Sequence, residues 1–241
     1  IKVKNVNDRN NLPSLKIIDI PIYYKNPFNV SLKESSKYVI KSLNLAHTLV
    51  KNKSVCAVIN CPINKNLIKS SGKIGVTEFF ASKCKVKKSS EVMLIHNKRF
   101  SVVPLTTHLD IKDVSKNITS HLMIRKLQTL NKDFKKLFKF KPRIGVLGLN
   151  PHNSEFKKAS EEISIIRPCI LKLKRKGFKI EGPLVADTIF INKYKNYDVI
   201  VGMYHDQVLT PFKTIFKFNA INITLGLNYL RVSPDHGPAF E

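Results

Sequence analysis

Three histidines occupy similar settings along this chain. They end the segments PLTTH, GLNPH and GMYH, at His108, His152 and His205. Each follows a short apolar run of the kind that forms a buried strand. A neutral imidazole at the end of a strand is a good ligand for a divalent transition metal, and three such ligands with an open position make a Lewis-acid site. The three histidines together therefore predict a metal centre for small-molecule chemistry.

A lone histidine in such a place would more often be a hydrogen-bonded loop or core residue. Three histidines at corresponding positions reverse that preference. His47, His96 and His121 lack this setting, and we expect them on helix or turn surfaces.

Two carboxylates lie close to these segments in the sequence. Asp206 directly follows His205, and Asp187 lies in the segment GPLVADT. Either carboxylate could orient a metal ligand, hold a substrate amine or take a proton. For Asp187, a role as a helix N-cap or in an Asx turn is an equally good interpretation of the residue type.

Lys213, Asn222 and Arg231 add a point charge, an amide and a guanidinium group. Such a set suits a phosphorylated substrate, because guanidinium and ammonium groups bind phosphate oxygens through charge-assisted hydrogen bonds. In a lysine-rich chain Lys213 alone would mean little, but it lies shortly after the His205 segment.

Short apolar strands and helices alternate along most of the sequence. The patterns predict strands at 16–24, 55–59, 91–96, 100–104, 144–149, 198–203 and 220–225. They predict helices at 31–51 with Ser31 as the cap, from residue 75, at 111–138, and at 160–176 with a kink at Pro168. This alternation indicates an α/β fold with a largely parallel sheet. Ligands of such folds gather at the carboxyl ends of the strands, so we expect the three histidines to converge there.

Composition limits the class of protein. With 241 residues and 43% hydrophobic side chains, the chain can form one large domain or two smaller ones. It has no apolar run long enough to cross a bilayer and no signal-peptide pattern. The four cysteines form no CxxC unit, so we expect reduced thiols in a cytoplasmic protein.

The net charge of +25, from 42 basic and 17 acidic residues, allows two interpretations. One is a surface that binds nucleic acid, and the other is a lysine-rich coding bias that falls on solvated faces. We favour the second, because the lysines are dispersed along the chain and arginine is scarce. The planar guanidinium group of arginine binds phosphate through two hydrogen bonds and would be the better residue for nucleic acid.

Several motifs in one order make the assignment specific. The segments GVTEFF, THL, GLNPH, GPLVADTIF, MYHDQ, NITLG and DHG follow one another from residue 75 to residue 237. In this order the chain resembles the 4-hydroxythreonine-4-phosphate dehydrogenase family of pyridoxal-phosphate biosynthesis. The resemblance covers nearly the whole chain from about Ser31 onward.

The resemblance implies a two-domain αβα dehydrogenase of the isocitrate/isopropylmalate-dehydrogenase-like type with a mostly parallel sheet. The first domain would comprise residues 1–70 plus 229–241 and the second residues 71–228, with the metal site and the dimer interface in the second. The protein would be a homodimer that shares its metal site between subunits. It would use NAD or NADP and a divalent metal, which could be zinc, cobalt, nickel, manganese or magnesium.

Residue by residue, the resemblance makes His108, His152 and His205 the metal ligands, one of them supplied by the partner subunit. Thr77, Lys213, Asn222 and Arg231 match substrate-binding positions. Asp187 and Asp206 match carboxylates near the substrate and, with Lys213, are the expected catalytic residues. The implied reaction oxidises the secondary alcohol of 4-phosphohydroxy-L-threonine to a β-keto acid, which decarboxylates to 3-amino-2-oxopropyl phosphate. The family lacks a GxGxxG fingerprint, as does this chain, so individual cofactor contacts stay unassigned.

The chain departs from the family pattern at several positions. Val76 replaces a histidine, Asn153–Lys157 replace a glycine-rich stretch with bulkier residues, and Asn60-Cys61-Pro62 replaces Thr-Gly-Pro. The chain starts at Ile1 and stops at Glu241, which we interpret as a processed, trimmed or partial sequence. Two alternatives therefore stay open: a divergent paralogue that oxidises another hydroxy acid or diol, and a non-catalytic basic binding protein.

Overall fold

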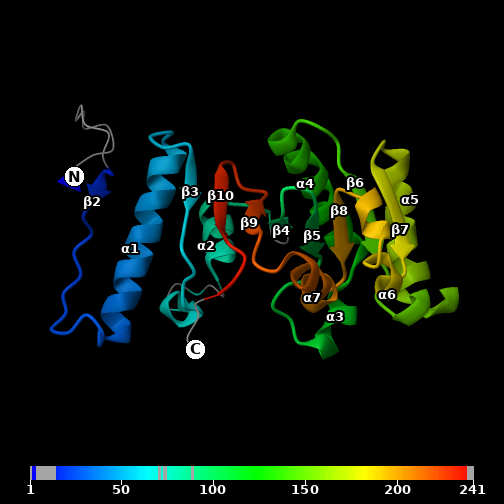
Figure 1. Ribbon diagram of the computed structural model, residues 1–241, viewed down its shortest axis with the longest axis horizontal. Helices are drawn as coiled ribbons and strands as arrows, with labels where there is room; N and C mark the ends of the chain where they lie inside the picture. The colour runs from blue at the N-terminus through cyan, green and yellow to red at the C-terminus, as the bar shows by residue number, and fades with distance from the viewer. Residues whose placement is uncertain (1, 4–14, 70–71, 73–74, 88–89, 238–241) are drawn as a thin grey trace. The chain divides into compact units, whose positions relative to one another are not determined.

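The computed structural model describes residues 2–3, 15–69, 72, 75–87 and 90–237. Contacts divide the chain into two compact units (Figure 1). Unit 1 comprises Ile1–Lys85 and Leu227–Glu241, and unit 2 comprises Val86–Gly226. The domain boundaries expected from the sequence, after residues 70 and 228, stay a prediction.

Unit 1 contains the long helix α1 (Leu32–Lys51), which begins where the sequence predicts. The Ser31 hydroxyl accepts a hydrogen bond from the Glu34 amide at 3.3 Å and so satisfies one of the free N–H groups of the first turn. Helix α1 packs against β3 (Ala57–Ile59), which pairs in parallel with β10 (Leu230–Pro234). The predicted cap and helix are therefore confirmed.

The remaining elements of unit 1 are short. They are β1 (Lys2–Val3) paired in parallel with β2 (Ile17–Ile18), the 3-10 turn η1 (Lys65–Leu67) and helix α2 (Val76–Lys83). The strand predicted over 16–24 is wrong beyond Ile18. Pro21 lacks an N–H for a strand ladder, and the neighbouring side chains Tyr23 and Tyr24 are exposed, so no core holds this stretch in a sheet.

Unit 2 is built on six strands in the order β9-β4-β5-β8-β6-β7. Their bounds are β4 (Val92–His96), β5 (Ser101–Pro104), β6 (Arg143–Leu147), β7 (Lys179–Leu184), β8 (Val199–Gly202) and β9 (Ile221–Leu225). Strands β5, β8, β6 and β7 run parallel, while β4 runs antiparallel to β5 and β9. The predicted α/β class with a largely parallel sheet is confirmed.

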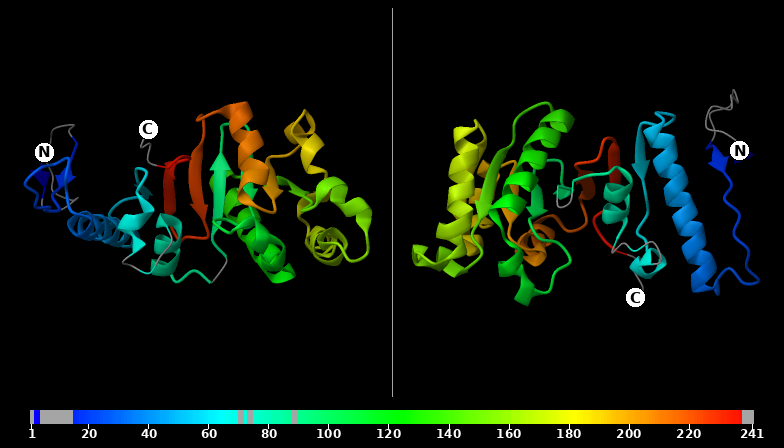
Figure 2. Two further views of the ribbon diagram at one scale, coloured as in Figure 1. Left: turned by 90° about the horizontal axis from the view of Figure 1, so that it is seen from below. Right: turned by 180° about the vertical axis from the view of Figure 1, so that it is seen from behind.

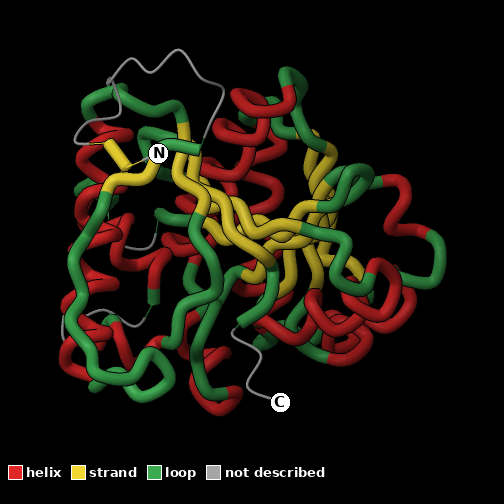
Figure 3. The backbone as a smooth tube through the Cα atoms, turned by 60° about the vertical axis from the view of Figure 1, so that its left-hand side comes forward, coloured by secondary structure: helices red, strands yellow, loops and turns green. Residues whose placement is uncertain are grey.

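Helices α4 and α7 lie on opposite faces of this sheet (Figure 2), so helices flank it on both sides (Figure 3). The helices of unit 2 are α3 (Ile111–Asn117), α4 (Ser120–Phe138), α5 (Arg167–Arg175), α6 (Ala186–Ile189) and α7 (His205–Phe216), with a short 3-10 turn, η5 (Lys193–Asn196). Val208 and Phe212 of α7 are fully buried against Phe100, Val102 and Ile200. Each such side chain contributes about 1.5–3 kcal/mol on burial, which fixes α7 on the sheet.

Two predicted helices are interrupted in the structure. The helix expected over 111–138 breaks at Ile118, which is buried with an extended backbone, and Thr119 then caps α4 by accepting from the Leu122 amide at 3.2 Å. The helix expected over 160–176 starts as a π turn, η4 (Glu162–Ile166), before α5. Pro168 is the second residue of α5, which directly follows this π turn.

Among the described helices, none combines the length and apolar character needed to cross a bilayer. All four cysteines are free: Cys56, Cys61, Cys84 and Cys169.

Candidate metal and substrate site

The carboxyl ends of β5, β8 and β6 lie next to one another at one edge of the unit 2 sheet. The three strands are neighbours and run parallel, so the segments that leave them emerge on the same side. His108 follows β5, His152 follows β6, and His205 is the first residue of α7 after β8. Such an edge is where α/β folds bind their ligands.

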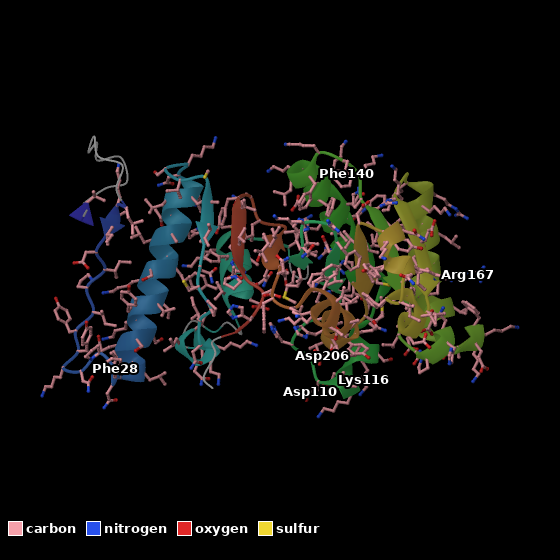
Figure 4. All side chains as sticks on the ribbon, in the orientation of Figure 1. Phe28, Asp110, Lys116, Phe140, Arg167 and Asp206 are labelled. Atoms are coloured by element: carbon pink, nitrogen blue, oxygen red, sulfur yellow. The ribbon has the colours of Figure 1, made fainter. Side chains whose placement is uncertain are left out.

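His108 and His205 lie side by side, with ring centroids 6.4 Å apart and planes inclined by 32°. His205 Nδ1 is 2.7 Å from Asp206 Oδ1, so the carboxylate holds the imidazole and leaves Nε2 to face a ligand. Next to this pair is a cavity of about 400 Å³ lined by Thr106, Thr107, Leu109, Asp110, Ile111, Tyr204, His205 and Asp206. Asp110 and Asp206 are labelled together near α3 and α7 in Figure 4, while Phe140 lies at the other end of unit 2.

His152 lines a second cavity, of about 240 Å³, together with Asp187. Its other lining residues are Leu149, Asn150, Pro151, Ala186, Tyr204 and Gln207. Tyr204 lines both cavities. Asp187 is in the first turn of α6, and the N-cap position of this helix is occupied by Val185, not by Asp187.

Within the described parts of the chain, no three His, Cys, Asp or Glu side chains are grouped to hold a metal ion. A single chain thus presents His108 and His205 as a pair and His152 separately. The donor chemistry of the pair, two imidazoles beside carboxylates, nevertheless fits a divalent transition metal that takes a further ligand from elsewhere. The three-histidine site stays a prediction.

The segment that carries His152 has an unusual backbone. From His152 to Phe156 every residue has φ between 48° and 57°, within the turn η3 (Pro151–Phe156). In this left-handed region the conformational free energy of each non-glycine residue is roughly 1–2 kcal/mol higher, so contacts with the surrounding structure must hold the turn in place. One such contact is Asn153, which is 2% exposed and donates from Nδ2 to the Pro183 carbonyl at 3.1 Å.

A buried carboxylate that the sequence did not single out holds the start of this segment. Glu162 is wholly buried, and its Oε1 accepts from the Leu149 and Asn150 amides, both at 2.8 Å. Burial by itself raises the pKa of Glu162, but these bonds and one from Asn150 Nδ2 outweigh it and hold the pKa below its ordinary value. In the sequence, the available signal for this role was the adjacent acids Glu161 and Glu162 in a strongly basic chain.

Glu161 supports the same segment from the side. It accepts hydrogen bonds from Asn150 Nδ2 at 2.9 Å and from the Ser115 hydroxyl of α3. The bond from Ser115 is the main reason that the pKa of Glu161 lies below its ordinary value. Asn150 is therefore held by two neighbouring carboxylates just before His152.

In unit 1, Arg231 and Thr77 come together. Arg231 is 3% exposed, donates from Nε to Asn60 Oδ1 at 2.8 Å, and has a terminal nitrogen 3.5 Å from Thr77 Oγ1. Burial lowers the pKa of Arg231 to about 10, against the opposite influence of the Glu78 and Tyr229 side chains. The guanidinium is still charged at neutral pH and, beside a hydroxyl, suits an anionic group.

The two remaining predicted substrate residues lie in unit 2. Lys213 is on α7, with Nζ 5.2 Å from the centre of the Phe218 ring. Asn222 is on β9, and its Oδ1 is buried with no hydrogen-bond partner among the described residues. A buried amide oxygen without a donor costs free energy, which a donor group on a ligand would recover.

The expectation for the other histidines holds only in part. His121 is exposed on α4, as predicted, but His47 is buried on α1, with Nδ1 2.8 Å from the Tyr229 hydroxyl. Burial, then Lys51 and Lys83, lower the pKa of His47. The expectation for His47 is wrong because α1 turns this position toward Tyr229.

Comparisons with known proteins agree on one family. The family model of the pyridoxal phosphate biosynthetic protein PdxA matches residues 1–241. A 4-hydroxythreonine-4-phosphate dehydrogenase of Sulfurihydrogenibium sp. (strain YO3AOP1) is 37% identical over 246 residues, covering 100% of this chain and 74% of that protein. The enzyme of the same name from Aquifex aeolicus (strain VF5) is 40% identical over 191 residues, covering 78% of this chain and 59% of that protein.

Among solved structures, the 4-hydroxythreonine-4-phosphate dehydrogenase of Klebsiella pneumoniae matches with a TM-score of 0.86 and 27% identity, covering 100% of this chain and 75% of that chain. The chain thus spans between 59% and 75% of the length of these relatives. The match confirms the predicted dehydrogenase-type fold. The chain belongs to the PdxA family of pyridoxal phosphate biosynthetic proteins.

Proposed function

We propose that this chain is an NAD- or NADP-dependent, divalent-metal-dependent dehydrogenase of 4-phosphohydroxy-L-threonine. Its product, a β-keto acid, loses carbon dioxide to give 3-amino-2-oxopropyl phosphate on the route to pyridoxal 5′-phosphate. The observation that carries the proposal is the adjacent pair His108 and His205 at the strand edge, in a chain whose named relatives are 4-hydroxythreonine-4-phosphate dehydrogenases.

His108, His152 and His205 are the proposed metal ligands. Separation of His152 from the other two within one chain supports a site completed by a second subunit in a homodimer. Zinc, cobalt, nickel and manganese, and less readily magnesium, suit such ligands. The metal would supply a Lewis acid for the substrate's alcohol oxygen, and the nicotinamide an acceptor for hydride.

Asp187 and Asp206 are the proposed proton acceptors for the alcohol. Asp187 lines the same cavity as His152, and Asp206 contacts His205, so each carboxylate lies beside a proposed ligand. As the alcohol carbon gives up hydride, its hydroxyl proton passes to a carboxylate and a ketone remains. In the second step the bond to the carboxylate carbon breaks, and Lys213 is the proposed donor of the proton that the resulting carbanion takes up.

Arg231 with Thr77, and Lys213 with Asn222, are the proposed substrate-binding groups. The buried guanidinium suits a phosphate or carboxylate, and the unpartnered Oδ1 of Asn222 suits the substrate's amine or hydroxyl. The Val76 side chain, at the start of α2, cannot form a hydrogen bond with a substrate. The hydroxyl of Thr77, the next residue, is therefore the proposed substrate-binding group. We place the enzyme in the cytoplasm.

The test is turnover by the purified chain. With cobalt or zinc, NAD or NADP, and 4-phosphohydroxy-L-threonine, reduced nicotinamide and carbon dioxide should form in equal amounts. The same assay without phosphate on the substrate should be much slower, because the substrate would lose its charge-assisted hydrogen bonds to Arg231. An absence of turnover by metal-loaded dimer would overturn the proposal.

The same preparation tests the alternatives left open by the sequence. Equal rates with and without the phosphate would identify a paralogue acting on another hydroxy acid or diol. Tight nucleic-acid binding with a steep dependence on salt would identify a basic binding protein instead.

A further inference from the structure

The side chain of Gln207 hydrogen-bonds to the ends of two strands at once. Its Oε1 accepts from the Met203 amide at 2.7 Å, and its Nε2 donates to the Gly148 carbonyl at 2.8 Å. Met203 lies just after β8 and before His205, while Gly148 lies just after β6 and before His152. We propose that Gln207 is a positioning residue that fixes the spacing between the segments carrying these two histidines.

The hydrogen bonds continue on both sides of Gln207. The Met203 carbonyl accepts from Thr106 Oγ1 at 2.7 Å and from the Thr106 amide at 3.1 Å, which connects it to the segment that carries His108. Beyond Gly148, the next two amides donate to the buried carboxylate of Glu162. All three histidine segments are thus held by one continuous set of bonds, with Gln207 at its centre.

Position 207 requires a side chain as long as glutamine that carries both a hydrogen-bond donor and an acceptor. A glutamate would place an oxygen against the Gly148 carbonyl, asparagine is one methylene shorter, and methionine keeps the length without either group. The neighbouring backbone also leaves room for this amide, because a Cβ on Gly202 would lie 3.0 Å from Gln207 Oε1 and 2.5 Å from Val208 Cγ1. Glycine at the end of β8 therefore permits the contact.

This inference rests on the proposed metal site, since its consequence is metal affinity. Residues that orient metal ligands without binding the metal change affinity by about 10–100-fold when removed. Both hydrogen bonds of the Gln207 side chain go to backbone groups, so its effect is expected through the backbone.

The test compares Gln207→Met with Gln128→Met in the full chain. These are the two glutamines of the sequence, and Gln128 is exposed on α4, which makes it a matched control. Cobalt binding, followed by visible absorption, should weaken about 10–100-fold in Q207M and stay unchanged in Q128M. Hydrogen exchange at the Met203 amide should quicken only in Q207M. If Q207M does not fold, Gln207→Glu serves in its place with the same expected weakening.

A double-mutant cycle with His152→Ala separates positioning from general stability. If Gln207 acts by placing the His152 segment, Q207M should weaken cobalt binding much less when His152 is already absent. Equal weakening in both backgrounds, or unchanged cobalt affinity in Q207M, would overturn the inference while leaving the proposed function intact. Failure of the wild-type chain to bind cobalt at all would instead overturn the proposed metal site and this inference with it.

Discussion

Arg231 Nε donates a 2.8 Å hydrogen bond to Asn60 Oδ1, which joins β10 to the segment that follows β3. Asn60 occupies the first position of the Asn-Cys-Pro turn. The bond uses the inner nitrogen of the guanidinium and leaves the terminal nitrogens toward Thr77. Asn60 therefore sets the direction in which a buried cation can meet an anion.

Replacing Asn60 by Asp should weaken phosphate recognition, because a carboxylate at this position would compete with the substrate's phosphate for the Arg231 guanidinium. The KM for the phosphorylated substrate should rise about tenfold or more, with a smaller change in kcat, since one charge-assisted bond is worth about 1.5–3 kcal/mol. Asn66→Asp, at an exposed position on η1, is the control and should leave KM unchanged. An unaltered KM in N60D would show that Arg231 does not bind the phosphate.

Replacing His205 by Ala should abolish tight metal binding, because half of the adjacent imidazole pair is lost. Equilibrium dialysis with zinc should show affinity reduced by more than the roughly 10–100-fold expected for a residue outside the ligand set. His121→Ala, on the exposed surface of α4, should bind zinc as the wild type does. A chelator should remove activity from wild type and zinc should restore it; full activity after chelation would contradict a catalytic metal.

The stability of unit 2 should fall in acid through Glu162. Its folded-state pKa lies below the ordinary value of 4.5, so the ionised carboxylate stabilises the fold above that value. This contribution disappears as the pH falls through the folded-state pKa. Glu162→Gln should cost about 2–3 kcal/mol at neutral pH, since it leaves amides around a weaker acceptor. Chemical denaturation across acid pH should show the difference between wild type and E162Q shrinking; a constant difference would refute the assignment.

The left-handed turn after His152 should gain stability from a glycine. Ser154 has φ 53° and ψ 27°, a region that glycine adopts without strain, so Ser154→Gly should raise stability by about 1 kcal/mol. Lys172→Gly, on the exposed surface of α5, should instead cost about 1 kcal/mol, as is usual inside a helix. Thermal melting decides the matter, and a loss of stability in S154G would mean that the turn is right-handed in solution.

Much of the fold follows from local sequence. Ser31 with Glu34 predicted the start of α1, and the apolar runs at 91–96 and 100–104 predicted the strands β4 and β5. These features depend on residues close together in the chain. The expectation that the three histidine segments leave the sheet at one edge followed only from the general rule for parallel sheets, and the structure supplied the order and adjacency of β5, β8 and β6.

Other features depend on distant contacts and were missed. Strand β7 contains Gly182-Pro183, and α7 contains Pro211, so local rules argued against both elements. Each element forms nevertheless, because it packs against the core of unit 2. In α7, for example, Phe212 is fully buried in that core. The partners of the Glu162 carboxylate could not be predicted for the same reason: they are the amides of Leu149 and Asn150, which only the folded chain brings to it.

Because β5, β8 and β6 run parallel, each strand contributes a separate connecting segment to the edge of the sheet at which the three histidines lie. Each histidine follows its own strand, with His108 in a loop, His152 in the turn η3 and His205 at the start of α7, outside the ladder hydrogen bonds that register the sheet. Such a segment can therefore change in length or composition without shifting its neighbours, as long as the hydrogen bonds of Thr106 and Gln207 to the adjoining strand ends are kept. For protein engineering, residues 154–158 form a segment whose side chains can be varied while Asn153 keeps the turn after His152 in place.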